Sequence, residues 1–255
     1  MKMPDKIRIL CLHGFTSNGA IHAHQARKIT SLFSQQSSSS TTPIYEFLFP
    51  DGPHIVEAAS IKDPTWRSYV SANSTAGHRA WWFARDSSFT DSSFINPETG
   101  GYYGLEESLK AIGELIRRDG PVDAIWGFSQ GACLAGMLMA LLSDSGKKLT
   151  DPLVKELRGY LPENQKTPGA GLFFSGFRAR YERYHGLYEG GIRAPTLHVM
   201  GEDDALVSVE RSRVLVGVCG DGAEELRHRN GHNLPKEEVE LEKVAEFLRR
   251  NLDGR

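Results

Sequence analysis

The chain has 255 residues, of which 40% are hydrophobic and 24% charged, and its formal net charge is −2. These proportions are ordinary for a globular enzyme, and the near-neutral charge gives no electrostatic reason to expect a nucleic-acid or anionic-membrane partner. No segment approaches the roughly 18 consecutive apolar residues that span a membrane, and the first residues contain no signal-peptide core. We therefore expect a cytoplasmic protein. The cysteines are too few and scattered for a disulfide framework or a zinc site, and Cys11 and Cys133 are expected to be reduced core residues.

The first elements alternate between strand and helix. Residues 7–12 form a β-rich run that ends at His13-Gly14, and 25–33 have the spacing of a short helix. The polar, serine-rich segment 34–43 predicts a surface loop, and 45–49 predict a second strand. This order favours an α/β architecture.

Residues 54–103 lack a regular pattern and are rich in aromatic side chains. A long irregular stretch inside an enzyme domain is usually a lid or a binding loop. Its aromatic residues have two interpretations. They either pack the lid itself or form an apolar wall suited to an acyl chain or an aromatic acyl group. Regular structure returns at 105–117, where apolar residues recur at helical spacing.

The most informative motif is Gly127-Phe128-Ser129-Gln130-Gly131, which fits the pattern G-x-S-x-G. The motif is weak alone in a chain with 26 glycines, so its flanks must support it. An apolar run at 122–126 precedes it, and a small, apolar run at 132–142 follows it. That order predicts a strand, a sharp turn and a helix, which is the context of a nucleophile elbow with an exposed serine hydroxyl.

The later apolar runs complete an α/β pattern. They predict three strands and an amphipathic helix, at 170–175, 196–200, 225–228 and 239–252. Apolar strands separated by helices predict a mainly parallel central sheet with helices on both faces. Because the chain shows no repeat and no convincing linker, we expect residues 1–255 to form a single α/β domain that includes the lid or binding-loop region at 54–103.

The chain also offers the base and the acid that a serine nucleophile requires. In α/β-hydrolases the acid follows the serine, and the histidine comes last. Asp204 follows a predicted strand in the pattern G-x-x-D-x-x-V, with Asp203 and Glu202 as alternatives. His232 lies on a glycine-containing loop after the last predicted strand. Because parallel sheets gather functional groups at the carboxyl ends of their strands, we predict a catalytic triad of Ser129, His232 and Asp204.

Other histidines fit the triad less well. His198 lies inside an apolar strand and is expected to be a hydrogen-bonded core residue, whereas His228 is expected at a solvated strand end. His22 and His24 are candidates for the rim of a pocket, but they precede the serine. The order of residues therefore favours His232.

Acyl transfer also needs two N–H donors that stabilise a tetrahedral oxyanion. One is predicted to be the backbone amide of Gln130, the residue after the nucleophile. The other is predicted in the loop after the first strand, where Gly14 allows a turn that directs the Phe15 amide toward the serine. Thr16 is the alternative donor.

Short blocks along nearly the whole chain carry a family resemblance, at 10–15, 49–54, 103–109, 127–132, 195–198, 201–207 and 231–232. Together they resemble the fungal and eukaryotic serine hydrolases called the FSH family, within the α/β-hydrolase superfamily. The resemblance implies an α/β-hydrolase fold, a triad of Ser129, Asp204 and His232, and activity on esters or thioesters. We therefore expect a metal-independent serine hydrolase that uses no cofactor.

The resemblance also implies candidate substrates and a protein partner. Some fungal members are accessory hydrolases of polyketide pathways that release or edit acyl chains on a synthase, which implies an acyl carrier domain as a partner besides small-molecule esters and thioesters. The enzymatic alternatives are a general short-chain carboxylesterase and an acyl-protein thioesterase. A non-catalytic α/β-hydrolase that binds a ligand is disfavoured because all three triad residue types are present.

Overall fold

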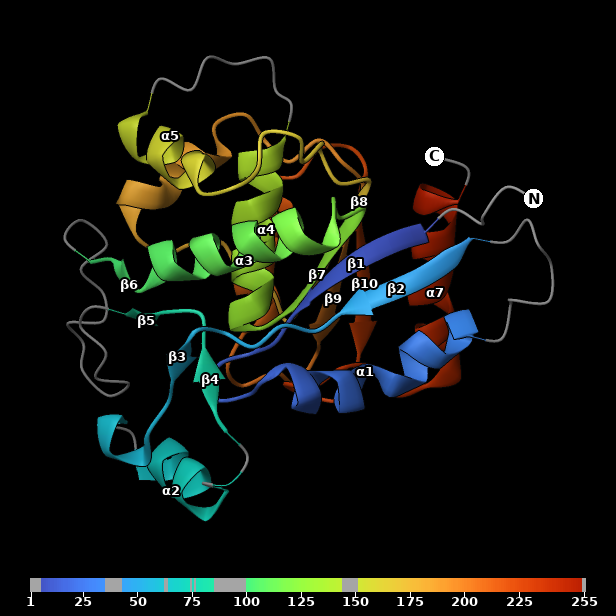
Figure 1. Ribbon diagram of the computed structural model, residues 1–255. Helices are drawn as coiled ribbons and strands as arrows, with labels where there is room; N and C mark the ends of the chain where they lie inside the picture. Colours follow the sequence, from blue (N-terminus) through green and yellow to red (C-terminus); the bar gives the residue numbers. More distant parts are fainter. Residues whose placement is uncertain are drawn as a thin grey trace.

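In the computed structural model, six strands of the described residues form one parallel sheet (Figure 1). From edge to edge they are β10 (Ala223–His228), β9 (Thr196–Gly201), β8 (Ala170–Phe174), β7 (Ala124–Phe128), β1 (Lys6–Leu12) and β2 (Ile44–Leu48). The structure describes residues 6–34, 43–61, 64–73, 75, 77–84, 100–143 and 151–253. Most of the predicted polar loop at 34–43 lies outside them. The predicted α/β class and parallel sheet are confirmed.

The order of the strands creates a switch point between β1 and β7. The chain starts in β1 at the interior of the sheet, continues to β2 at one edge, and then returns to the other side of β1. From β7 it proceeds outward through β8 and β9 to β10. Open parallel sheets bind ligands at the carboxyl ends of the strands beside such a reversal. This topology places the ends of β1 and β7 next to each other.

Helices cover both faces of the sheet (Figure 1). One face carries α1 (Gly19–Ser34) and α7 (Glu238–Leu252). On the other face α4 (Gln130–Leu142) and α6 (Val209–Val216) contact the sheet, and α3 (Leu105–Asp119) and α5 (Pro152–Gly159) belong to the same hydrophobic core. Because side chains alternate along a strand, β1 contributes Ile9 and Cys11 to the first face and Leu10 and Leu12 to the second. Each face therefore has its own hydrophobic core.

Helix α4 is apolar around almost its whole circumference, and nearly all of its residues are buried. This character is expected of a helix packed inside a core. The helix has 13 residues, whereas about 20 are needed to cross a bilayer. No helix among the described residues combines the length and the apolar character that a membrane span requires.

Helix α1 begins at Gly19, earlier than the predicted start at residue 25. The side chain of Asn18 accepts a hydrogen bond from the Ile21 amide at 2.8 Å, as an N-terminal cap does. The Gly19 amide donates to the Asp51 carboxylate at 2.8 Å. The second contact comes from a distant turn, so the local spacing of apolar residues could not reveal it.

The region at 54–103 is more regular than predicted. Its described residues contain two antiparallel pairs and a helix: β3 (His54–Ile55) with β4 (Arg79–Ala80), β5 (Phe83–Ala84) with β6 (Tyr102–Tyr103), and α2 (Pro64–Ala72). Val56, Ile61, Val70 and Ala80 form a small buried cluster of their own. That cluster orders the region without the long periodic patterns on which the sequence prediction depended.

Candidate active site

The strand, turn and helix predicted around Ser129 are present as β7, a sharp turn and α4. Ser129 has φ 54° and ψ −114°, a strained conformation for a residue with a side chain. Glycines on both sides permit it. A Cβ on Gly127 would lie 2.2 Å from the Gly131 carbonyl oxygen, and a Cβ on Gly131 would lie 2.2 Å from the Leu12 carbonyl oxygen. The turn thus requires both glycines of the motif.

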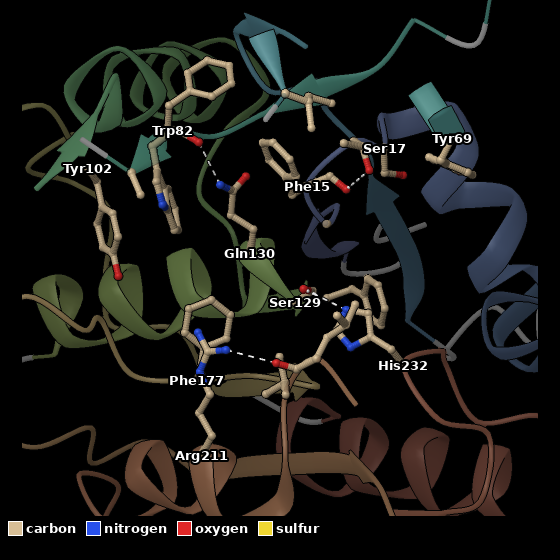
Figure 2. Close-up of a pocket in the computed structure, with 18 of the residues that line it drawn as sticks. Phe15, Ser17, Tyr69, Trp82, Tyr102, Ser129, Gln130, Phe177, Arg211 and His232 are labelled. Atoms are coloured by element: carbon tan, nitrogen blue, oxygen red, sulfur yellow. Dashed lines mark hydrogen bonds between the residues drawn. The ribbon is translucent and has the colours of Figure 1, made fainter. Parts of the chain in front are cut away.

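The structure brings Ser129, His232 and Asp204 into one hydrogen-bonded chain. Figure 2 shows its contact between Ser129 and His232. His232 Nε2 lies 3.0 Å from Ser129 Oγ, and His232 Nδ1 lies 2.7 Å from Asp204 Oδ2. In the neutral imidazole, Nδ1–H donates to the carboxylate while Nε2 accepts a hydrogen bond from the serine hydroxyl. The three residues lie at the carboxyl ends of β7, β10 and β9.

Asp204 is held by four donors. Its Oδ1 accepts from the amides of Leu206 at 2.9 Å and Val207 at 2.8 Å, while its Oδ2 accepts from Ser175 Oγ at 2.8 Å and from His232. Burial alone would raise the pKa of Asp204, but the hydrogen bonds outweigh burial and hold the pKa below its usual value. The carboxylate is therefore ionised at neutral pH.

The alternative carboxylates occupy different positions. Asp203 and Glu202 are exposed at the surface of the turn. Glu202 lies 3.5 Å from the guanidinium of Arg229, in an exposed ion pair. Among the three candidates, Asp204 is the one that contacts His232.

Ser175 is a site residue that the sequence pattern does not predict. It follows β8 with φ 46° and donates its hydroxyl to the same oxygen of Asp204 that accepts from His232. Its signal in the sequence was its place just before a glycine, at the carboxyl end of a predicted strand. Nothing in the local pattern showed that its partner would be 29 residues away.

Phe15, Thr16 and Gln130 all line the pocket that contains Ser129. Gln130 is the first residue of α4, and the first four amides of an α-helix have no carbonyl partner within the helix. Thr16 has φ 60°, and its carbonyl lies 2.7 Å from the ring of the buried His78. The loop after β1 is thus fixed beside the elbow.

His13 ties this loop to the turn after β2. Its Nε2 accepts from the Gly52 amide at 2.8 Å, so its Nδ1–H donates to the Gly14 carbonyl at 2.7 Å. Burial lowers the pKa of His13 to about 4, which keeps the ring neutral. Its carbonyl accepts from the Trp81 indole N–H at 2.8 Å. The residue is therefore structural.

The side chain of Gln130 connects the elbow to the region at 54–103. Its Oε1 accepts from the Trp81 amide at 2.9 Å. Its Nε2 donates to the Trp82 carbonyl, also at 2.9 Å (Figure 2). The sequence pattern predicts a role only for the backbone amide of Gln130. In the structure its side chain also holds one wall of the pocket in place through these two hydrogen bonds, which we call the Gln130 latch.

A pocket of about 560 Å³ opens above Ser129 and His232. Its walls are mainly apolar and include Phe15, Ile61, Trp82, Phe83, Phe128 and Phe177. Both interpretations of the aromatic residues therefore hold in part. Trp82, Phe83 and Tyr102 line the pocket, whereas Trp81 is fully buried as packing. The two phenylalanines at 89 and 94 lie outside the described residues.

The predictions for the other histidines have mixed outcomes. His198 is buried 3.1 Å from the Thr196 hydroxyl, as expected. His228 is not solvated but buried, because the following loop folds back and the Asn230 amide donates to its Nδ1. His22 does not reach the pocket rim, since it is buried among core aromatic rings, and His24 is exposed away from the pocket.

The described part of the chain contains no group of three or more His, Cys, Asp and Glu side chains placed to hold a metal ion. The described cysteines are free, and Cys11 and Cys133 are buried, as predicted.

Comparisons with known proteins agree with this geometry. The chain is 30% identical to Esterase OVCA2 of Danio rerio, over 96% of this chain and 97% of that protein. It is 28% identical to Esterase CG5412 of Drosophila melanogaster, over 99% of this chain and 77% of that protein. Acyl-protein thioesterase 2 of Zea mays has the same fold, with a TM-score of 0.54 and 18% identity over 98% of this chain and 96% of that one. The family model described as "Serine hydrolase (FSH1)" matches residues 1–244, so the chain belongs to this serine hydrolase family.

Proposed function

We propose that the protein hydrolyses an ester or thioester through a covalent acyl-enzyme. The hydrogen-bonded chain Ser129–His232–Asp204, with its 3.0 and 2.7 Å contacts, carries this proposal. Ser129 Oγ attacks the carbonyl carbon while His232 Nε2 takes the serine proton. Asp204 orients the imidazole and stabilises its charged form. His232 then protonates the departing alcohol or thiol.

Hydrolysis of the acyl-enzyme repeats these steps with water as the nucleophile. His232 takes a proton from water, the hydroxide attacks the acyl carbon, and the proton returns to Ser129 as the acid departs. We assign the oxyanion to the backbone amides of Gln130 and Phe15. The start of α4 supports the first assignment, because the positive end of the helix dipole and an amide without a helical partner lie beside the nucleophile.

The apolar walls support an acyl group with a hydrocarbon portion, since pockets for such groups are mostly apolar. The names of the relatives, esterases and an acyl-protein thioesterase, support both ester and thioester substrates. We include among the candidates an acyl chain carried by a polyketide synthase carrier domain, which the family resemblance implies. A short-chain carboxylesterase is the alternative.

We further propose that residues 1–255 act as one domain, with 54–103 as its lid or binding region. The hydrogen bonds that Gln130 forms with Trp81 and Trp82 support this, because they join that region to the elbow. We also propose a cytoplasmic location, with which the free cysteines are consistent.

The proposal is tested by labelling with a fluorophosphonate, followed by a panel of p-nitrophenyl esters, acyl-pantetheine thioesters and a carrier-bound polyketide. Ser129→Ala should abolish labelling and lower kcat by about 10³-fold or more. Ser31→Ala, on the outer face of α1, is the matched control and should label normally. Full activity in Ser129→Ala would refute the mechanism. Failure of the native chain to label would favour a non-catalytic ligand-binding protein.

A further inference from the structure

The charged side chains that line the active-site pocket are cationic. Two arginines, Arg180 and Arg211, line the same pocket as Ser129, and no described residue of its lining is an aspartate or a glutamate. Asp204, whose buried side chain is engaged by four donors, offsets only part of this charge, and its effect on Arg211 is smaller than that of Arg180. The pocket therefore combines apolar walls with a net positive charge.

Arg211 is held in a defined position. It projects from α6, its guanidinium lies 4.1 Å from the centre of the Phe177 ring, and one N–H donates to the Leu206 carbonyl at 3.1 Å (Figure 2). A guanidinium has five N–H donors, so this contact leaves most of them to point elsewhere. Among the described residues, no carboxylate forms an ion pair with Arg211.

A neighbour on the same helix shows how a surface arginine differs. Arg213 is exposed and pairs with Glu225 at 3.2 Å, away from the pocket. Arg211 instead is half-buried, and burial, followed by repulsion from Arg180, lowers its pKa below the usual value. Two cations that repel each other in a partly desolvated cavity destabilise the empty site, and an anion between them relieves that repulsion.

We propose that the substrate carries a second, anionic group, a carboxylate or a phosphate, that Arg211 binds while Ser129 attacks the carbonyl carbon. This inference rests on the proposed hydrolase function. Arg211 supplies planar N–H donors that match the oxygens of such a group, and Arg180, which lines the same pocket, adds positive potential. The anion lies either at the far end of the acyl chain or on the leaving group.

Matched substrate pairs separate these two sources. The acyl pair is the p-nitrophenyl monoester of adipic acid, with a free carboxylate, and the same compound with that carboxylate capped as a methyl ester. The leaving-group pair is hexanoyl-phosphopantetheine and hexanoyl-pantetheine. For one pair, the native enzyme should favour the anionic member by about tenfold or more in kcat/KM, since hydrogen bonds to charged groups have about this effect.

Variants assign the preference to Arg211. Arg211→Met, which keeps an apolar stem beside Phe177, should lower the anionic-to-neutral ratio of kcat/KM by about 10- to 100-fold. Arg211→Lys should retain part of the ratio. The control Arg213→Met, on the outer face of α6, should leave it within about twofold. If Arg211→Met does not fold, inhibition by adipate or inorganic phosphate is measured on the native enzyme with a neutral ester. Competitive inhibition then supports an anion site at Arg211, and the absence of inhibition overturns the proposal.

Failure of this inference differs from failure of the proposed function. Equal use of both members of each pair, with hydrolysis still dependent on Ser129, would overturn the anionic substrate and leave the hydrolase intact. A ratio that Arg211→Met does not change would also overturn it. If none of the four compounds is hydrolysed in a Ser129-dependent way, the proposed function itself fails.

Discussion

Gln130→Met tests whether one side chain holds a wall of the active-site pocket. Gln130 is buried, and its amide group pairs with both the N–H of Trp81 and the carbonyl of Trp82. Methionine has a similar volume but makes neither bond. Each backbone group left buried without a partner costs about 1–3 kcal/mol, so the two together cost about 2–6 kcal/mol. Global unfolding would then occur about 5–20 °C lower in a chain of this length.

Local opening is an alternative to global destabilisation, because the two unpaired backbone groups can reach water if the segment at 79–84 opens. In that case the loss appears as faster amide hydrogen exchange in this segment rather than as a lower midpoint. Trp82 and Phe83 line the pocket, so opening should also lower kcat/KM for a long-chain ester by about tenfold. The backbone amide of residue 130 is retained, and Ser129 should still react with a fluorophosphonate.

Gln165 provides the control. It is also buried, and its amide pairs with the N–H and carbonyl of Val122, each at 2.9 Å, far from Ser129, and it donates to the Lys166 carbonyl at 2.7 Å as well. Gln165→Met should lower the thermal midpoint by a similar or larger amount but leave kcat/KM unchanged. A Gln130→Met protein with native midpoint, exchange and kcat/KM would refute the latch. An equal loss of kcat/KM in both variants would show that general destabilisation, and not the wall, is responsible.

Two further predictions concern buried ionisable groups. Ser175→Ala removes a donor to ionised Asp204 and should lower the free energy of unfolding by about 1.5–3 kcal/mol at pH 7. Because the folded-state pKa of Asp204 is depressed, this stabilisation exists above its unfolded pKa and is lost as pH falls, so urea titrations should converge below about pH 4. His22→Leu removes a ring whose pKa burial lowers to about 3, so that only the unfolded state takes its proton between pH 6.5 and 4. As the pH is lowered from 6.5 to 4, the free energy of unfolding of the native protein should fall, and that of the variant should fall by roughly 3 kcal/mol less. An identical pH dependence of the two proteins would contradict this.

Much of the fold could be predicted because its strands are apolar runs separated by helices. The apolar runs alone are sufficient to locate the strands, and all of the predicted strands occur within a residue or two of their expected positions. Helices α5 and α6 were not predicted, since each has only eight residues and depends on caps, from Asp151 and Ser208. The start of α1 required Asp51, which lies 32 residues from Gly19. Elements that depend on such distant contacts leave little trace in a local pattern.

The candidate site divides in the same way. Ser129, Asp204 and His232 each lie in a turn at a strand end, where glycine and polar residues interrupt an apolar run, so local pattern and chain order were sufficient to select them. The contacts that position these residues and the pocket wall could not be predicted from the sequence. Ser175 reaches Asp204 only after the sheet brings β8 and β9 together, and Gln130 reaches Trp81 only after the region at 54–103 packs against the start of α4.

The two strained serines show how the sheet fixes the site before a substrate arrives. Ser129 and Ser175 both have positive φ, and each amide continues the ladder of hydrogen bonds to the next strand, to Phe174 at 2.9 Å and to Val199 at 2.8 Å. These bonds hold each turn at the level where its hydroxyl meets His232 or Asp204. A site fixed by the backbone needs little reorganisation during the reaction. We therefore expect selectivity to come from groups outside this frame, namely the aromatic residues beside Gln130 and the two arginines that line the pocket.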